Sequence, residues 1–161
     1  MVRIACMLLC ILVLGAALGA ARDQEDVPEL LKELKSKNAK TRAVAAQALG
    51  KIGAIKAADA KDAVPMLIAL LKSDKEATVR RAAADALGRI DPDPKETVPA
   101  LLEALKDKDA AVRQAAAAAL GQFPNDKEEI MPALREVQKD KNKMVERAAK
   151  QSLKNLREQK N

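Results

Sequence analysis

Few side chains in this sequence could carry out acid–base or covalent chemistry. The chain of 161 residues contains no histidine, and its two cysteines, Cys6 and Cys10, lie in an apolar stretch near the start. Histidine and cysteine are the usual zinc ligands, and they also supply the imidazole base and the thiolate nucleophile of many enzymes. Carboxylates such as Asp85, Glu103 and Glu136 occur singly, in separate segments. We therefore expect no catalytic, metal-binding or cofactor-binding residues.

Two further kinds of site were considered on sequence grounds. No Gly-rich phosphate-binding loop is present in the sequence. The segment DPDP, Asp91–Pro94, could hold a hard cation through its carboxylate oxygens. However, aspartate and proline in this order are typical of a turn, which is the interpretation we favour. The sequence therefore predicts a protein that is not an enzyme.

The polar residues are arranged by a unit that occurs four times. Its most regular part reads AKTRAVAAQALGKIG, ATVRRAAADALGRID and AAVRQAAAAALGQF, and a degenerate fourth copy reads KMVERAAKQSLKNL. The aligned leucines, Leu49, Leu87, Leu120 and Leu153, lie 38, 33 and 33 residues apart. A second shared piece, such as VPALLEALK from Val98, precedes each copy. A constant period near 33 residues with two pieces per unit is typical of a helical repeat array. The predicted repeats cover about 27–53, 64–91, 98–123 and 130–156.

Each piece has the pattern of an α-helix. In the first, leucines recur at spacings of three and four, and prolines at Pro28, Pro65, Pro99 and Pro132 are expected in the first turn, where a proline is tolerated. In the second, the apolar face of one copy consists of Val112, Ala115/Ala116, Ala119/Leu120 and Phe123. Gly50, Gly88 and Gly121 come late in this helix, where a larger side chain would hold the next unit away. The alanines are therefore predicted to be contact positions between stacked helices.

Composition supports an all-α fold. Hydrophobic residues make up 48% of the chain and aromatic residues only 1%, with Phe123 as the single aromatic residue. Alanine is the strongest helix former and lets backbones approach closely. The formal net charge is +6, but acidic and basic residues are mixed along the chain, which indicates a solvated surface more than a basic binding patch.

The first residues are predicted to be a targeting segment. Arg3 is followed by an apolar run from Ile4, by glycines and alanines, and by the polar stretch Asp23–Asp26. This order is typical of a secretory signal peptide. We expect residues 1–21 to be removed by cleavage near Ala20 or Ala21, which exports residues 22–161. The alternative is an uncleaved membrane anchor over residues 4–20, which would be the protein's only contact with a membrane.

The repeat pattern resembles the HEAT repeat family, in the short bacterial form also found in phycobilin lyases. The matching residues in the third copy are Val98-Pro99, Leu101, Lys106, Asp109, Val112-Arg113, Ala115–Ala117 and Leu120-Gly121, and the resemblance covers about residues 27–156. It implies a right-handed α-solenoid of about four helix pairs, preceded here by the hydrophobic signal helix. Departures at Thr41, Glu146 and Lys154 fall in the first and last units, which we interpret as caps with a wet outer face.

Arginines recur at one position of the unit, at Arg42, Arg80 and Arg113, which suggests a ladder. In HEAT-like folds the equivalent arginine is structural and pairs with a turn aspartate of its own or an adjacent repeat. The resemblance therefore implies a structural role here, and Asp74 and Asp109 are the expected partners.

The candidate binding surface lies on the second helices, which usually line the concave face of such a solenoid. Positions one, five and nine after the repeat arginine point away from the buried face, and they vary between repeats while core positions do not. An ordinary solvated face is the alternative interpretation. The predicted partner-binding residues are Arg81, Asp85, Arg89, Gln114, Gln122, Arg147 and Gln151.

Three functions remain open on these observations. The first is a non-enzymatic scaffold that binds another protein or a peptide along the concave face. The second is nucleic-acid binding, suggested by the isoelectric point near 9.4, although base stacking requires aromatic platforms that this chain lacks. The third is a bilin-lyase-like enzyme, which only the repeat type suggests. The scaffold is the function that the sequence favours.

Overall fold

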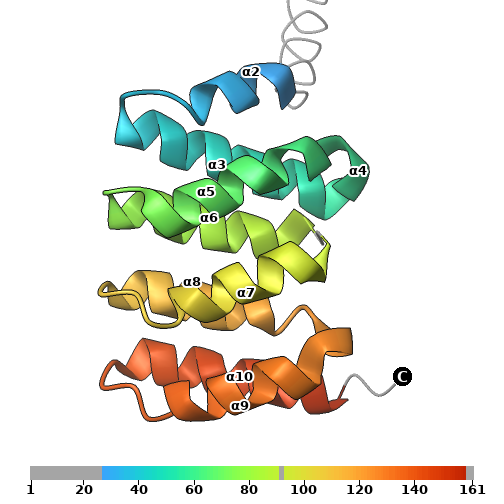
Figure 1. The fold of residues 1–161 in the computed structure, drawn as a ribbon, viewed down its shortest axis with the longest axis vertical. Coiled ribbons are helices and arrows are strands. Elements are labelled where there is room, and N and C mark those ends of the chain that lie inside the picture. Colours follow the sequence, from blue (N-terminus) through green and yellow to red (C-terminus); the bar gives the residue numbers. More distant parts are fainter. Residues whose placement is uncertain (1–26, 91–92, 159–161) are drawn as a thin grey trace, which may run out of the picture.

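The computed structural model describes residues 27–90 and 93–158, and within them the chain forms helical repeats without strands. The predicted signal peptide or anchor, residues 1–21, lies outside the described residues. Helices follow one another in pairs that stack along the long axis of the molecule (Figure 1). The pairs are α2 (Val27–Glu33) with α3 (Ala39–Ile55), α5 (Val64–Ser73) with α6 (Ala77–Ile90), α7 (Pro94–Ala104) with α8 (Ala110–Leu120), and α9 (Lys127–Val137) with α10 (Lys143–Glu158). The predicted all-α solenoid of four helix pairs is therefore confirmed.

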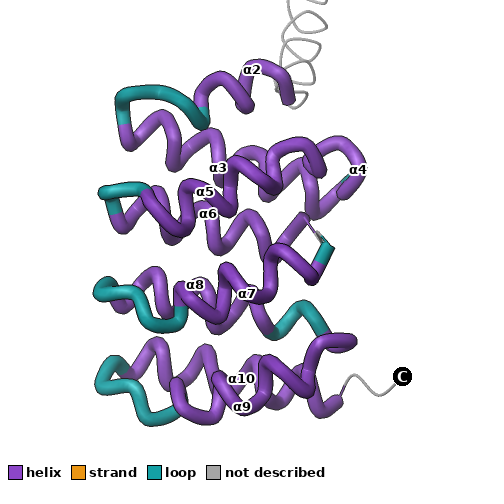
Figure 2. Tube along the Cα trace, in the orientation of Figure 1, coloured by secondary structure: helices purple, strands orange, loops and turns teal. Residues whose placement is uncertain are grey.

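The helices form two layers. We call the first member of each pair the A helix (α2, α5, α7, α9) and the second the B helix (α3, α6, α8, α10). The loops between A and B helices gather at one end of the layers, as Figure 2 shows. The core lies between the layers, and the aligned leucines Leu49, Leu87, Leu120 and Leu153 are buried in it. The apolar face predicted for the third B helix, from Val112 to Phe123, is buried as expected.

Small residues allow consecutive B helices to pack closely. A Cβ atom added to Gly88 would lie 2.7 Å from Cβ of Ala119 on α8, and one added to Gly50 would lie 2.9 Å from Cα of Ala86 on α6. A methyl group does not fit at such distances without a shift of the helices. The predicted role of the repeat glycines is therefore confirmed.

The B helices contact one another far more extensively than the A helices do. The B layer is thus the more closely spaced side of the stack. The assignment of the outer surface of the B helices to the concave face of the solenoid stays a prediction.

The first-turn prediction for the prolines is correct for Pro65 and wrong for Pro99 and Pro132. Pro65 lies at the start of α5, whereas Pro99 and Pro132 lie inside α7 and α9. α7 begins earlier because the Asp93 side chain accepts a hydrogen bond from the Lys95 amide and Pro94 fills the first helical position. Both internal prolines are exposed.

Between the first two pairs the chain carries an insertion. α3 continues to Ile55, and the short helix α4 (Ala57–Ala60) and a 3-10 turn, Lys61–Ala63, lead into α5. Ala60 and Ala63 are buried, and Ile55 is 89% exposed at the corner. The insertion therefore both lengthens a helix and forms a protruding corner.

Arginines of the B helices tie each repeat to the next. Arg42 donates to Asp74 (Nε to Oδ2, 2.7 Å), and Arg113 donates to Asp140 over the same distance. Each arginine also donates to carbonyls of the turn before its own helix, for example Arg113 Nη1 to Asp107 O at 2.8 Å. The arginine ladder is thus built from Arg42–Asp74, Arg80–Asp107 and Arg113–Asp140.

The prediction that Asp109 pairs with a ladder arginine is wrong, whereas the same prediction for Asp74 is confirmed. The Asp109 carboxylate caps α8 and accepts from the amides of Ala111 (2.8 Å) and Val112 (3.3 Å). An N-cap side chain folds back onto its own helix, so it cannot also reach the previous repeat. Asp107, two residues earlier, faces Arg80 instead.

The ladder ends where the residue types change. In the first repeat Ser36 occupies the position of the ladder aspartates and accepts from the Asn38 amide at 3.2 Å. In the fourth repeat Glu146 occupies the arginine position and pairs with Lys143 and Lys150, whose hydrogen bonds lower the pKa of Glu146 to about 2. These substitutions agree with the prediction that the outer repeats are caps.

Within residues 27–90 and 93–158, no helix has both the length and the apolar character needed to cross a membrane.

Candidate functional site

The candidate site is a band of side chains along the outer surface of the B helices. We call it the B-face stripe, and every member is at least partly exposed. Three residues come from each B helix or from the turn just after it, one turn apart, so the band crosses all four repeats. The members are Ala43, Gln47, Lys51, Arg81, Asp85, Arg89, Gln114, Ala118, Gln122, Arg147, Gln151 and Asn155.

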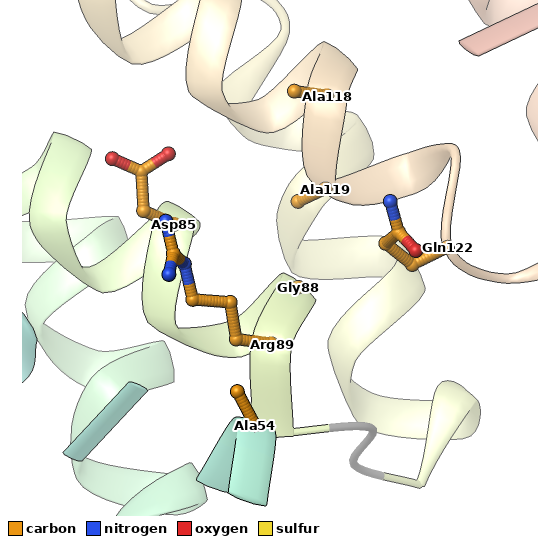
Figure 3. A pocket seen from close by; sticks show the side chains of 7 residues that line it. All are labelled: Ala54, Asp85, Gly88, Arg89, Ala118, Ala119 and Gln122. Carbon is orange, nitrogen blue, oxygen red and sulfur yellow. The ribbon is translucent and has the colours of Figure 1, made fainter. Parts of the chain in front are cut away.

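Two pockets lie side by side in this stripe. The pocket between α3 and α6 has a volume of about 200 Å³ and is lined by Gln47, Gly50, Lys51, Asp85, Ala86 and Arg89. The pocket between α6 and α8 has a volume of about 450 Å³ and is lined by Ala54, Asp85, Gly88, Arg89, Ala118, Ala119 and Gln122 (Figure 3). Asp85 and Arg89 line both, so the two pockets adjoin at α6, and we call the two together the groove.

Both pockets contain the small residues that bring neighbouring helices together. Gly50 contacts Ala86 in the first, and Gly88 contacts Ala119 in the second. Close packing of the helices therefore leaves hollows between the longer side chains that flank these contacts. The same residues that stabilise the stack make the surface concave on a scale that fits side chains of a ligand.

Ala118 accounts for the larger size of the second pocket. The corresponding positions in the other repeats hold the longer side chains of Gln47, Asp85 and Gln151. Ala118 is exposed and presents only a methyl group to the pocket, as Figure 3 shows. The irregularity of the third repeat at this position is thus what opens the space.

Asp85 is the one carboxylate among the residues that line the two pockets. It is partly buried, and this burial raises its pKa, while the positive charges of Arg81 and Arg89 act in the opposite direction. These arginines lie four residues before and after Asp85, on the same side of α6. The centre of the groove therefore has an acidic group between two basic ones.

The structure brings together only part of the predicted set. Asp85, Arg89 and Gln122 meet in the pocket between α6 and α8. Arg81, Gln114, Arg147 and Gln151 lie on the same face, outside the two pockets, and their role stays a prediction. Gln151 donates to Asn155 at 2.8 Å within its own helix.

Sequence reasoning missed the residues that form the hollows: Ala54, Gly50, Ala86, Gly88 and Ala119. It assigned the glycines and alanines only to helix packing. The sequence did contain a signal for these hollows. A glycine one turn before or after an exposed polar residue of the stripe leaves open space on the outer face of the B helix. The exchange of a long side chain for Ala118 in one repeat was a second signal.

The groove has the chemistry of a binding site. Its lining offers guanidinium and ammonium donors, amide groups that both donate and accept, and methyl surfaces. In the part of the chain that the structure describes, no group of three or more histidine, cysteine, aspartate or glutamate residues is placed to hold a metal ion. Asp93, the described aspartate of the DPDP segment, serves as a helix cap.

The sequence matches a known family of repeats. The family model described as HEAT repeats matches residues 27–103 and 64–154, which together extend from α2 to α10. Among curated proteins no sequence matches significantly.

Several solved structures share the fold. An engineered protein is 28% identical, with a TM-score of 0.65, and the match covers 82% of this chain and 62% of that protein. The complex of CpcE and CpcF of phycocyanin lyase from Nostoc sp. PCC7120 contains a chain with a TM-score of 0.67 at 24% identity, covering 85% of this chain and 88% of that one. A designed armadillo repeat protein in complex with the peptide (KR)4 has a TM-score of 0.65 at 21% identity, covering 79% and 62%. The last two similarities concern the fold alone.

Proposed function

Because the chain belongs to the HEAT repeat family, we propose that it is a non-enzymatic scaffold that binds another protein or a peptide along the B-face stripe. The observation that carries this proposal is the pair of adjacent pockets that share Asp85 and Arg89 in their lining. Hollows distributed over three consecutive B helices, α3, α6 and α8, suit an extended chain better than a compact small molecule.

The distribution of variable and uniform positions supports a binding role. The buried leucines of the B helices are the same in all four repeats, at Leu49, Leu87, Leu120 and Leu153. The stripe positions differ from one repeat to the next. A uniform core that carries a variable surface is the arrangement by which solenoid proteins present a specific binding face.

Relatives of the same fold support a polypeptide partner in general. The designed armadillo repeat protein was solved with a peptide, and the phycocyanin lyase chain was solved in a complex of two proteins. In the groove of this chain, Gln47 and Gln122 each offer one acceptor and two donor hydrogens, which matches the needs of a peptide backbone. Methyl groups such as that of Ala118 suit the apolar parts of ligand side chains.

The proposal includes no catalytic step. The sequence contains no histidine, and the residues that line the two pockets include one carboxylate and no hydroxyl or thiol group. A bilin-lyase-like activity would need reactive or tetrapyrrole-binding groups, and no observation in the groove favours it.

Export is part of the proposal and rests on the sequence of residues 1–21. The scaffold acts outside the cytoplasm after cleavage near Ala20 or Ala21. Mass spectrometry of the protein from the exported fraction would show an N-terminus at Ala21 or Arg22. A chain that retains residues 4–20 and sediments with membranes would instead establish the anchor.

Peptide selection with a charge-reversal variant tests the binding surface. Random peptides displayed on phage are selected on the wild-type protein, and the enriched peptides are then titrated calorimetrically. The variant Arg81→Glu/Arg89→Glu/Arg147→Glu is expected to lose at least about tenfold in affinity, because three charges reverse at the groove.

The matched control reverses three basic residues of the A helices that are at least partly exposed: Lys95→Glu/Lys127→Glu/Arg135→Glu. It carries the same change in net charge and is expected to bind like the wild type. Circular dichroism verifies that both variants fold. Equal binding by the stripe variant, or enrichment of no peptide at all, contradicts the proposed function.

A further inference from the structure

The arginines of the described residues fall into two groups with opposite surroundings. Those of the ladder are largely buried and bonded to a carboxylate; for example, the Arg80 side chain is 7% exposed. Those of the stripe, Arg81, Arg89 and Arg147, are exposed, and no hydrogen bond or ion pair to them is found within residues 27–90 and 93–158. Their guanidinium groups are therefore available to a ligand.

Six of the eight arginines among the described residues lie in the ladder or the stripe. Outside the ladder and the stripe, the described residues contain arginine only at Arg135 and Arg157, whereas lysine is common on every other surface. Arginine binds carboxylates with two parallel hydrogen bonds and is less strongly hydrated than lysine. The ladder itself demonstrates this geometry in the present chain, since Arg113 holds Asp140 through Nε and Nη2 at 2.7 and 3.0 Å.

The B-face stripe carries a net positive charge. Lys51, Arg81, Arg89 and Arg147 are basic, and Asp85 is the single acidic member. Lys51 and Arg89 stand together at the pocket between α3 and α6. A ligand with negative side chains would meet complementary charge over most of the stripe, and a basic ligand would meet it only at Asp85.

Resting on the proposed function, we infer that the partner presents an acidic, extended polypeptide segment whose carboxylates bind Arg81, Arg89 and Arg147. The segment crosses α6 where the two pockets adjoin, with its apolar atoms over Ala118 and Ala119. Asp85 lowers the positive potential at the centre and disfavours a carboxylate directly above it. The groove thus distinguishes a segment with separated acidic residues from a uniformly acidic one.

A nucleic acid is the main rival ligand for a basic groove, and the lining favours a polypeptide. Single strands bind through aromatic side chains on which bases stack, together with a positive groove. The one aromatic residue of the chain, Phe123, is buried at 4% exposure, so it offers no stacking surface.

Three labelled probes and single-residue variants test the inference by fluorescence anisotropy at low salt, where the Debye length exceeds about 10 Å. The probes are a short peptide of alternating glutamate and serine, its lysine and serine counterpart, and single-stranded DNA of similar length. We expect the acidic peptide to bind the full chain most tightly. Arg89→Gln should weaken it by about threefold to tenfold, and Asp85→Asn should strengthen it by about twofold.

An acidic ligand is identified by opposite changes in affinity: Arg89→Gln weakens its binding and Asp85→Asn strengthens it. A basic ligand would give the reverse, with Asp85→Asn weakening and Arg89→Gln strengthening its binding. Ala118→Gln, which restores the side-chain length found in the other repeats, should weaken the acidic peptide by about fivefold because it fills the larger pocket. Arg135→Gln, on the A layer, is the matched control and should leave the affinity unchanged.

The outcomes separate the acidic partner from the general scaffold. Tighter binding of the lysine peptide, with the reverse changes in affinity, overturns the acidic preference and leaves the polypeptide groove intact. Tighter binding of DNA, or binding of neither peptide, overturns both.

Discussion

Arg80 and Asp107 lie 27 residues apart in the sequence and are joined by two parallel hydrogen bonds. Nε donates to Oδ2 at 2.7 Å, and Nη2 donates to Oδ1 at 2.8 Å. The same guanidinium donates from Nη1 to the carbonyls of Asp74 and Lys75, the turn of its own repeat. One side chain therefore fixes the second repeat to the third and closes the turn that precedes its own helix.

Removing this guanidinium should destabilise the whole array. In Arg80→Ala the Asp107 carboxylate, 12% exposed, would keep its charge and lose its partner. Loss of one partner from a largely buried pair costs about 3 kcal/mol. Urea denaturation should show this decrease in the free energy of unfolding. The adjacent exposed residue provides the control, because Arg81→Ala should change stability by less than about 0.5 kcal/mol; equal effects of the two substitutions would refute the ladder's role.

The ladder should also make the fold sensitive to acid. Hydrogen bonds from Arg80 and Arg113 lower the pKa of Asp107 and Asp140. At Asp74 burial raises the pKa, but the hydrogen bonds from Arg42 and the Glu76 amide outweigh it and the net shift is downward. A lowered folded-state pKa contributes stability that is complete above the unfolded value of about 3.9 and is lost as the pH falls through the folded value.

The free energy of unfolding is measured at a series of pH values by urea titrations that are monitored by circular dichroism. It should change little from neutral pH down to about pH 5 and fall below about pH 4. Asp107→Asn should reduce the slope of this fall, since one of the three linked carboxylates is gone. An unchanged slope in the variant would mean that other groups cause the acid sensitivity.

Gly88→Ala should separate α6 from α8. The added methyl group would lie 2.7 Å from Cβ and 2.8 Å from Cα of Ala119. Overpacking costs about 1–3 kcal/mol, and the gain in helix propensity of about 1 kcal/mol offsets only part of it. Thermal unfolding should therefore show a lower midpoint. Lys154 holds the corresponding position of α10, where the described chain places no further B helix, so Lys154→Ala should have no such effect.

Ser152→Ala tests the contact between the last two B helices. Ser152 is 3% exposed, and its hydroxyl donates to the Ala117 carbonyl at 2.7 Å. The Gly121 amide donates to Ala118 O, so it does not serve as the helical partner of Ala117. Losing this buried hydrogen bond should cost about 1 kcal/mol in urea denaturation. Ser73→Ala removes an exposed hydroxyl that bonds within its own helix and should be close to neutral.

The errors of the sequence interpretation have specific physical causes. Asp107 and Asp109 belong to the same short turn, and sequence alone offered either as the partner of an arginine. Alignment of the repeats separates them: the position of Asp107 is Asp in three repeats, whereas that of Asp109 varies among Asn38, Glu76 and Asn142. Pro99 was misplaced because the start of α7 depends on the Asp93 cap, which the expected register put outside the helix.

By itself the sequence determined the helix pairs, the period and the buried face, because helical periodicity and repeat register are local properties that can be counted along the chain. It also selected the face that could bind a partner. Only the tertiary structure decided that each ladder arginine holds an aspartate of the following repeat, and that Ala118 and Gly88 line a pocket shared with Asp85 and Arg89. Those relationships depend on distances between residues about one repeat apart, which are set by how closely small side chains let the B helices pack.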